Sequence, residues 1–417
     1  MLRPGRRPLK QALAAWEAGG NAGAGKGQRR LGRVPQIVVE ISPSGLDLGA
    51  DWHDLVARAT PNVFMHPVVF NALQSTGFGG AFALTAWDKT TEVPRLVGVW
   101  ALRRAPVTPI GPIILTAPPN EYCLISNPVI DGTHADSVIP AFLDAIARDP
   151  ALPKVIRLRY LDSSSESYPA LARALRARGA RSIIVSQRDR AFASPEAAAK
   201  QSGSTRKKLR QDWNRLAREG LVRVVNDRDS AAVVAAFETF LTIEGASWKS
   251  DRGTAVVSDE RNARFARAMI GSLAAEGGAS VALLMLDGRA IAAQVLLYSG
   301  RIAYTWKTGF DARYARFSPG ALLVGKATEE LFASGAVDGI ESCSHYGHFM
   351  KQFWTGRRTT VDIIIDLGSG LPWKFHAAQA KARGRLAAQR WRNRAQKKWK
   401  EWRKRPPAVT GANPPEA

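Results

Sequence analysis

The sequence has few cysteines and no long apolar run. Only Cys123 and Cys343 occur among its 417 residues, which excludes a disulfide-framed fold and favours a reducing compartment. No run of about 18 apolar residues is present. The longest uncharged stretch, 105–120, contains five prolines, so we interpret it as a loop and predict no transmembrane helix. The Arg-rich N-terminus lacks the apolar segment of a secretory signal, and we expect a cytoplasmic protein.

Three common catalytic motifs are also missing. The sequence contains no Gly-x-Ser-x-Gly elbow, no phosphate-binding loop ending in Gly-Lys-Ser/Thr and no His-Glu-x-x-His. Their absence argues against serine hydrolases, nucleotide hydrolases of the phosphate-loop type and the common zinc proteases. Cys343, His345 and His348 lie close together, but three such residues without a second cluster are a weak zinc signature, and we predict no metal.

Acidic residues are scarce relative to basic ones, with 36 Asp and Glu against 59 Lys and Arg and a net charge of +23. The excess is concentrated at the two ends. Residues 1–33 carry +7, residues 374–405 carry +12, and only +4 remains for the rest. Basic tails on a near-neutral body indicate a folded enzyme or binding domain that is tethered to something anionic.

The two ends differ in their predicted structure. We expect residues 1–33 to form a basic disordered tail. Residues 374–405 predict an amphipathic helix, limited to about twenty residues by Gly384 and the prolines after 405. Its Trp391, Trp399 and Trp402 fall on one stripe, which suits an anionic membrane surface. Binding of RNA or packing of the stripe on the body are the alternatives, and the chain end to 417 is expected to be disordered.

The body contains the same pattern of elements twice. In each copy the residue pattern predicts a β-hairpin, a third β-strand, a helix and a further strand, in the order β-β-β-α-β. The first copy has these at 81–102, 121–130, 136–148 and 154–160, and the second at 280–298, 301–308, 319–334 and 337–342. We therefore predict an α/β fold with two tandem domains, 34–195 and 196–373. Each would hold a mixed β-sheet flanked by helices.

Three segments of the second copy have residues suited to chemistry. In the first, a strand is followed by a loop with Asp311 and Tyr314, and Ser318-Pro319-Gly320 then opens a helix. Such a helix start can bind an anion such as pyrophosphate or a carboxylate through its free N–H groups and its dipole. An ordinary, well-capped helix start is the alternative interpretation.

The other two segments follow a helix and a strand. Trp248 and Lys249 lie in a loop where they are suited to line a substrate pocket or to anchor the loop. After the last strand of the second copy come Glu341 and His345, and a histidine has a pKa suited to proton transfer. Lys351 and Trp354 are three residues apart and so share a helix face.

Four motifs occur in one order along the chain: Thr205-Arg-Lys-Lys-Leu-Arg, Glu244-Gly-Ala-Ser-Trp-Lys, the stretch 307–323 with Phe-Ser-Pro-Gly-Ala-Leu-Leu, and Lys351-Gln-Phe-Trp. In these the chain resembles a bacterial family of GNAT-like acyltransferases associated with cellulose and exopolysaccharide biosynthesis. That family is related to the Fem-type aminoacyl transferases. The resemblance spans about residues 50–370 and implies two tandem GNAT-like domains, of which the first is degenerate.

The resemblance implies transfer of an acyl group from acyl-CoA to an amine or hydroxyl of an envelope-related acceptor, without a metal. Glu341 or His345, and after them Asp311, are its candidates for the base, and Tyr314 could return a proton to the thiolate. Ser318, Pro319, Gly320 and Lys307 would hold the donor. Trp248, Lys249, Lys351 and Trp354 would line the acceptor pocket.

Two other hypotheses remain open from the sequence. Fem-type relatives take aminoacyl-tRNA, and the basic helix that contains the Thr205 motif would suit that donor. The Gln/Arg-x-x-Gly-x-Gly/Ala loop of many GNAT enzymes is absent between the third strand and the helix of the second copy, which favours a third possibility, a non-catalytic scaffold docked through its basic tail.

Overall fold

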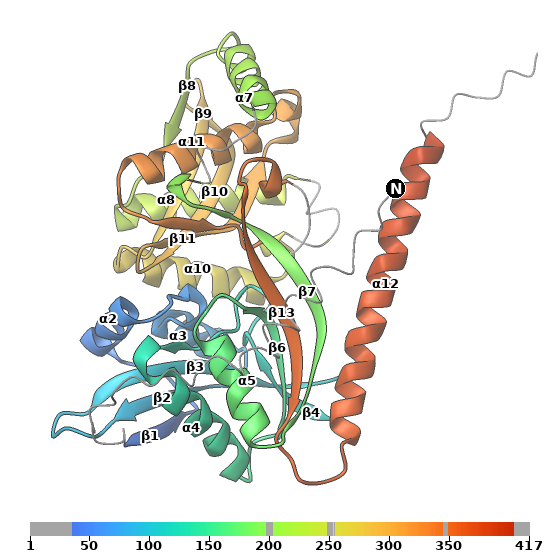
Figure 1. The fold of residues 1–417 in the computed structure, drawn as a ribbon. Coiled ribbons are helices and arrows are strands. Elements are labelled where there is room, and N and C mark those ends of the chain that lie inside the picture. Colours follow the sequence, from blue (N-terminus) through green and yellow to red (C-terminus); the bar gives the residue numbers. More distant parts are fainter. Residues whose placement is uncertain (1–35, 197–202, 248–252, 254, 345–348, 404–417) are drawn as a thin grey trace, which may run out of the picture.

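The computed structural model describes residues 36–196, 203–247, 253, 255–344 and 349–403 (Figure 1). In this part of the chain the strands form one mixed sheet of 13, in the order β1-β2-β3-β4-β6-β13-β7-β12-β11-β10-β9-β8, with β5 paired to β3. The strands are β1 Ile37–Ser42, β2 Ala81–Asp88, β3 Arg95–Pro106, β4 Ile113–Ala117, β5 Val129–Ile130, β6 Val155–Asp162, β7 Arg181–Ala193, β8 Val222–Val225, β9 Ala279–Leu286, β10 Arg289–Ser299, β11 Ile302–Phe310, β12 Gly339–Glu341 and β13 Gly356–Asp366.

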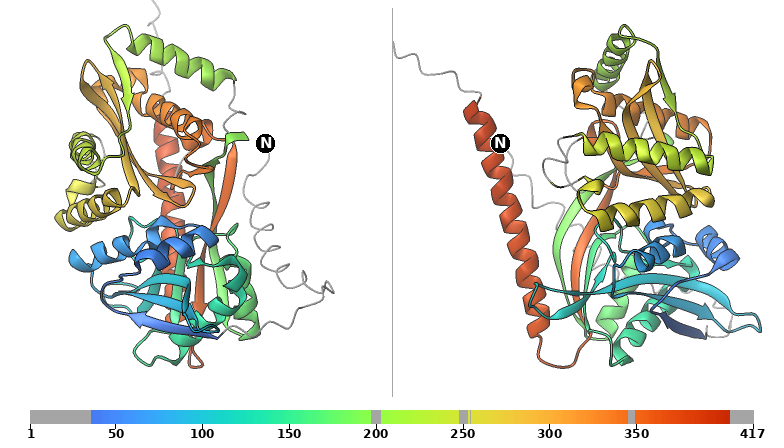
Figure 2. Two further views of the ribbon diagram at one scale, coloured as in Figure 1. Left: turned by 90° about the vertical axis from the view of Figure 1, so that its left-hand side faces the viewer. Right: turned by 180° about the vertical axis from the view of Figure 1, so that it is seen from behind.

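Helices cover both faces of this sheet (Figure 2). The α-helices are α2 Gly49–Arg58, α3 Pro67–Ser75, α4 Ala135–Arg148, α5 Ser167–Ala177, α7 Gly203–Leu216, α8 Ser230–Gly245, α10 Glu260–Ala275, α11 Pro319–Ala333 and α12 Trp373–Arg403. Short 3-10 helices are η1 Val63–Met65, η2 Gly132–His134, η3 Val256–Ser258, η4 Ala312–Phe317 and η5 Met350–Gln352. The predicted tail 1–33 lies outside the described residues.

The predicted repeat is confirmed. The first half contains β2-β3-β4-α4-β6 and the second contains β9-β10-β11-α11-β12 in the same order. Asp287 and Gly288 join β9 to β10 with φ angles of 47° and 81°, as a type I′ hairpin turn requires. The α/β fold class predicted from the sequence is therefore confirmed.

The third strand of the first half was misplaced by the sequence prediction. It is β4, Ile113–Ala117, inside the stretch interpreted as a loop, while 121–130 contains only the short β5. The prolines of that stretch flank β4 instead of interrupting it. Ile114 and Leu115 are buried between neighbouring strands, since β4 pairs with β3 and with β6. Tertiary pairing thus overrides the local proline signal.

One strand of the first half comes from the far end of the chain. β13 lies between β6 and β7 and is antiparallel to both. Its Val361, Ile363 and Ile365 are fully buried in the core of the first half. β7 pairs with β13 along its length and with β12 at its C-terminal end, so that β7 and β13 run between the two halves (Figure 1). The predicted domain boundaries, 34–195 and 196–373, remain a prediction. By sequence β13 belongs to the second of these domains, whereas it packs in the core of the first half.

The two halves share a hydrophobic core. Phe64 and Leu73 of the first half, with Cys123, pack in one buried cluster with Phe237 of α8 and Phe265 of α10. Burial of several large side chains at a contact of this kind is worth about 1.5–3 kcal/mol each. The cluster therefore fixes the loop that contains Cys123 against the second half.

His66 caps α3 in this shared region and makes stability depend on pH. Its Nδ1 accepts a hydrogen bond of 3.3 Å from the Val68 N–H, so its Nε2, 3.4 Å from Glu276, carries the proton of the neutral ring. Burial, together with His53, lowers the pKa of His66 to about 4. The unfolded state takes up a proton near pH 6.5 whereas the folded state resists until about pH 4. Acidification across that window should remove about 3 kcal/mol of stability.

Urea denaturation at several pH values tests this effect of His66. His66→Asn keeps an N-cap acceptor but does not titrate, so its unfolding free energy should fall much less between pH 7 and pH 4. An equal fall in both proteins would assign the acid sensitivity to other groups.

The C-terminal helix α12 is longer than predicted. It runs unbroken for 31 residues through Gly384, because the helix-forming Ala, Arg, Lys and Gln around it offset the cost of one glycine, about 1 kcal/mol. Phe375, Ala378 and Ala382 anchor it on the sheet, and Trp391 is 71% exposed and points to solvent. The side chains of Trp399 and Trp402 lie outside the described ones. Among the described helices none has the length and apolarity to cross a membrane.

Candidate functional site

β11 and β12 separate shortly after they begin to pair. They are parallel neighbours only over Ile302–Tyr304 and Gly339–Glu341, and β11 then continues to Phe310. The Thr305 hydroxyl donates to the Ser342 carbonyl at 2.9 Å, where the two strands part. From there on, β12 no longer covers the edge of β11, and a ligand with amide groups could hydrogen-bond along that edge.

The N-terminus of α11 opens beside this divergence. Ser318 precedes the helix in a left-handed conformation, φ 54°, and its side chain makes no cap hydrogen bond. A cavity of about 310 Å³ adjoins it, bordered by Ser318 of this turn, Thr205 and Lys208 of α7 and Phe353 after η5. The Lys208 ammonium group pairs with Asp212 of the same wall at 2.5 Å. Helix N–H groups without intrahelical partners suit an anion, and Lys208 adds a cation close by.

A second cavity, of about 340 Å³, lies between the two halves. Tyr122 and Leu124 line it from the first half, and Asp259, Trp306 and Lys307 line it from the second. The Trp306 indole N–H donates to the Tyr122 carbonyl at 2.9 Å, which holds the wall from the first half in place. The cavity is of ligand size and combines aromatic walls with a few polar groups.

A buried ion pair supports this cavity. The Glu244 side chain of α8 has no exposed surface, and its Oε1 lies 3.7 Å from the Lys307 Nζ. Its Oε2 accepts a 2.9 Å hydrogen bond from the Val256 N–H. The Lys307 Nζ also lies 4.8 Å from the centre of the Tyr122 ring. Lys307 is thus held in the cavity wall by an anion and by an aromatic face.

Glu341, at the end of β12, is a second buried carboxyl group. Burial raises its pKa, although Arg190 and Arg358 favour the charged form. Its Oε1 accepts a hydrogen bond of 3.2 Å from the Cys343 N–H, and Cys343 lines the cavity between the halves. A buried carboxyl group with a raised pKa at the end of a strand is a candidate proton acceptor.

Cys343 itself does not suit nucleophilic chemistry. Burial, and after it the charge of Glu341, raises the pKa of its thiol well above the ordinary value. The thiolate is the reactive form, so the thiol stays protonated at neutral pH. The arrangement therefore favours direct transfer between two bound molecules over a covalent intermediate on Cys343.

Asp311 and Tyr314, which the sequence suggested for proton transfer, make contacts that stabilise the local structure. Asp311 caps η4 and pairs with Arg313 at 2.6 Å and Arg289 at 3.7 Å. The hydrogen bond from Arg313 is the main cause that lowers the Asp311 pKa, and a carboxylate satisfied in this way is a weak base. Tyr314 packs against the hydrophobic cluster under α11. We leave both out of the site proposed below.

The four residues predicted to hold the donor lie on two faces of β11. Gly320 faces Thr308 and Phe310, and a Cβ there would lie 3.4 Å from the Phe310 ring. Lys307 instead contacts Glu244 of α8, and α8 and α11 cover opposite faces of the sheet (Figure 2). Ser318, Pro319 and Gly320 therefore stay together, while Lys307 belongs to the cavity between the halves.

Of the four residues predicted to line the acceptor pocket, the structure describes Lys351 and Trp354, and neither lines the cavity between the halves. Trp354 is 2% exposed within the hydrophobic cluster under α11, and its indole N–H donates to the Thr328 hydroxyl at 3.2 Å. Lys351 lies half-buried in η5. Trp248, Lys249 and His345 lie outside the described residues. Among those that are described, no three metal-ligating side chains gather.

Sequence reasoning missed Tyr122 and did not single out Glu244. Tyr122 lines the cavity from the first half of the chain, and no local sequence pattern indicates this position. Glu244 had a usable signal, because it is an acid directly after the apolar run of α8, in a helix whose Phe240 and Leu241 are buried. A lone acid on a buried helix face requires a partner, which here is Lys307.

Residues 203–343 match the family model described as "Acetyltransferase (GNAT) domain". No curated protein matches the chain. FemX has a similar structure, with a TM-score of 0.54 and 13% identity over 78% of this chain and 96% of FemX. A conserved protein of unknown function from Bacteroides thetaiotaomicron VPI-5482 has a TM-score of 0.50 and 11% identity, over 79% of this chain and 100% of that protein.

At such identities the structural likeness concerns the fold alone. The matched residues include α7, β11, the start of α11 and Glu341, and so contain most of the geometry described above. Residues 203–343 therefore match a GNAT-type acetyltransferase domain, and the chain has a fold similar to that of FemX.

Proposed function

We propose that the protein is an acyltransferase that moves an acyl group, most simply acetyl, from acyl-CoA to an amine or hydroxyl. The acceptor would be related to the cell envelope or to a polysaccharide. The observation that carries this proposal is the divergence of β11 from β12 beside the open N-terminus of α11. It lies within the segment that matches the acetyltransferase model.

Acyl-CoA would bind with its diphosphate at the N-terminus of α11 and its thioester near the end of β12. Coenzyme A has a diphosphate and an arm with two amide groups. The N-terminus of α11 with Lys208 offers a place for the diphosphate, and the uncovered edge of β11 offers partners for the amides. The thioester would then lie near the end of β12, next to the cavity that Tyr122 and Lys307 line.

The reaction needs little covalent help from the protein. The acceptor nitrogen or oxygen attacks the thioester carbonyl carbon, the carbon–sulfur bond breaks, and the acceptor loses a proton while the thiolate gains one. We assign the proton-accepting role to Glu341, whose burial raises its pKa. Lys307, held by Glu244, would stabilise negative charge on the carbonyl oxygen.

Aminoacyl-tRNA is a second candidate donor. Lys208 and Arg215 of α7 have exposed side chains, Lys208 lines the cavity beside Ser318, and the fold is similar to that of FemX. The Fem-type resemblance implies such a donor. Binding of tRNA that weakens steeply with salt would support it, and absence of binding at low salt would remove it. A third candidate is a scaffold without activity. Acyl transfer by the purified protein in a minimal assay would exclude it.

Gly320→Ala tests the donor site without disturbing the helix. The added Cβ would have only ordinary contacts with Phe310 and Thr308, and alanine favours a helix over glycine by about 1 kcal/mol. The methyl group enters the space between β11 and α11, so we expect coenzyme A affinity to fall about tenfold, equivalent to about 1.4 kcal/mol. Isothermal titration measures this. Gly325→Ala in the same helix, where a Cβ would meet Leu209 at 3.5 Å, should leave the affinity unchanged.

We further propose that α12 meets an anionic membrane surface. Its exposed Trp391 lies on the side of the helix opposite the buried Ala382 and suits the headgroup region. Trp391→Glu should reduce flotation with phosphatidylglycerol vesicles by about tenfold, since it removes an apolar anchor and adds a negative charge. Equal flotation of variant and wild type would contradict this placement.

A further inference from the structure

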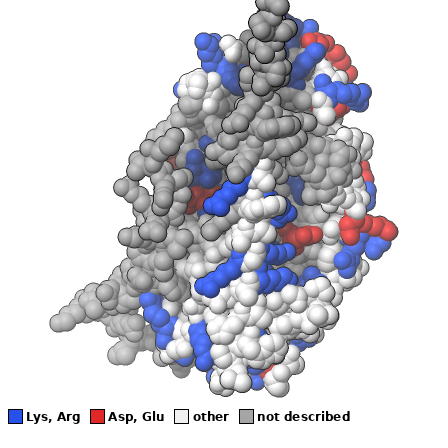
Figure 3. All heavy atoms as spheres, turned by 90° about the vertical axis from the view of Figure 1, so that its right-hand side faces the viewer, with Lys and Arg blue, Asp and Glu red and all other residues white. Residues whose placement is uncertain are grey.

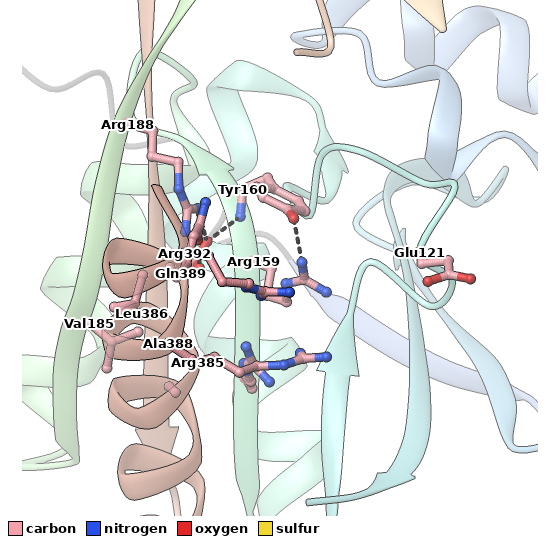
Figure 4. A pocket seen from close by; sticks show the side chains of 13 residues that line it. Glu121, Arg159, Tyr160, Val185, Arg188, Arg385, Leu386, Ala388, Gln389 and Arg392 are labelled. Atoms are coloured by element: carbon pink, nitrogen blue, oxygen red, sulfur yellow. Dashed lines mark hydrogen bonds and ion pairs between the residues drawn. The ribbon is translucent and has the colours of Figure 1, made fainter. Parts of the chain in front are cut away.

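A groove separates α12 from the sheet that it rests on. It has a volume of about 370 Å³ and is bordered by β6, β7, β13 and α12. Five arginines line it: Arg157, Arg159, Arg188, Arg385 and Arg392. They come from two strands and from the C-terminal helix and converge on one space (Figure 4). The space-filling view shows basic side chains gathered along this side of the molecule (Figure 3).

The acids in the groove do not balance these arginines. Its lining contains only two carboxylates, Glu121 and Asp362. Asp362 is committed to Arg188 at 3.3 Å and to the Tyr160 N–H at 3.0 Å. Within the described part of the chain, the other four arginines have no carboxylate within 4.0 Å. The groove therefore holds an excess of positive charge that its own residues leave uncompensated.

Two of these arginines are also short of hydrogen-bond partners. The Nε atoms of Arg157 and Arg159 are buried and have no partner among the described residues. Burial, and after it the charge of Arg159, lowers the pKa of Arg157 to about 10, and Arg385 acts in the same direction. Guanidinium groups that lie close together repel one another, and an anion bound between them would reduce the repulsion and supply the missing hydrogen bonds.

Tyr160, which lines the same groove, has an unusual backbone conformation. Tyr160 has a φ of 59°, which is unusual for an aromatic residue. It lies where the register between β6 and β13 shifts. Its ring lies 4.7 Å from the Arg159 guanidinium and 5.8 Å from that of Arg188. Strained backbone of this kind persists where surrounding contacts hold it, and it gathers at ligand sites.

We propose that this groove binds a diphosphate group, carried by a soluble organic diphosphate or presented by a phospholipid headgroup. Guanidinium groups match phosphate oxygens through paired hydrogen bonds. The volume suits a diphosphate with a sugar or glycerol attached, and is too small for a nucleic acid duplex. Glu121 lines both this groove and the cavity between the halves, so the rest of the ligand can extend toward that cavity.

Titration of the full-length protein with inorganic pyrophosphate at 150 mM salt tests the site. Wild type should bind pyrophosphate saturably, and the groove site is the one that the next variant removes. Arg385→Glu combined with Arg392→Glu should weaken binding at least tenfold, because both line the groove. Arg383→Glu combined with Arg394→Glu is the matched control. It makes the same charge change on exposed residues of α12 that do not line the groove, and it should retain wild-type affinity.

Competition then identifies the source of the phosphate. Displacement of pyrophosphate by phosphatidylcholine vesicles that contain CDP-diacylglycerol, whose headgroup carries a diphosphate, but not by phosphatidylcholine vesicles alone, supports a headgroup. Displacement by adenosine diphosphate alone supports a soluble ligand. No saturable binding to wild type, or equal weakening in both double variants, overturns the proposal. The readout is binding, so it is independent of whether the protein transfers acyl groups.

Discussion

Replacing Glu244 with alanine is expected to lower the free energy of unfolding by about 3–5 kcal/mol, the range measured when one partner of a buried ion pair is removed. The Glu244 side chain is fully buried, binds the Val256 N–H at 2.9 Å and lies 3.7 Å from the Lys307 Nζ. Its loss leaves both groups without that partner. Urea denaturation at pH 7 measures the change.

Acyl transfer should fall about 100-fold in the same variant even where it remains folded, because Lys307 loses the carboxylate that positions it. Glu244→Gln is the matched control, since its amide oxygen can still accept from Val256 but has no charge for Lys307. Combining it with Lys307→Met removes both charges and should recover part of the stability without the activity. A loss below about 1 kcal/mol in the alanine variant would contradict the buried pair.

Replacing Trp354 with alanine is the second change with a large expected effect. The sequence suggested a substrate contact, whereas the structure places the ring in the core with 2% exposure. Removal of a buried tryptophan costs about 3–5 kcal/mol through the cavity that it leaves. It also leaves the Thr328 hydroxyl without the indole N–H at 3.2 Å. Thermal and urea unfolding should both register this loss.

Trp354→Phe separates packing from substrate binding. It keeps most of the ring and loses one hydrogen bond, so stability should fall by about 1 kcal/mol and the KM for the acceptor should stay unchanged. A KM that rises several-fold in a variant of near-native stability would return Trp354 to the acceptor pocket.

The parts of the fold that follow from local patterns could be predicted. The two hairpins, the turn at Asp287-Gly288 and the helices 230–245 and 260–275 each have periodicity or capping residues within a few positions. The Ser318-Pro319-Gly320 helix start is likewise a local signal, and its position was predicted. The missing cap was not predicted, because Ser318 is a good capping residue by type but has a left-handed backbone and makes no cap hydrogen bond.

The parts that depend on distant partners could not be predicted. Nothing in residues 356–366 indicates that they pair with β6 and β7 of the first half. Tyr122 approaches Lys307 only after the two halves pack together. Asp311 was a plausible base by position, yet Arg313 and Arg289 lower its pKa, an effect of side-chain placement that the sequence order does not reveal.

Thermal unfolding of the full-length protein with acetyl-CoA, free coenzyme A and aminoacyl-tRNA tests the central claim most directly. Acetyl-CoA at 100 times its dissociation constant should stabilise the protein by about 2.7 kcal/mol. This stabilisation should shrink in Gly320→Ala and persist in Gly325→Ala. The account would be contradicted by one combined result. In that result neither acetyl-CoA nor free coenzyme A shifts the unfolding midpoint, whereas aminoacyl-tRNA shifts it clearly, which would rule out an acyl-CoA donor at the β11–β12 divergence.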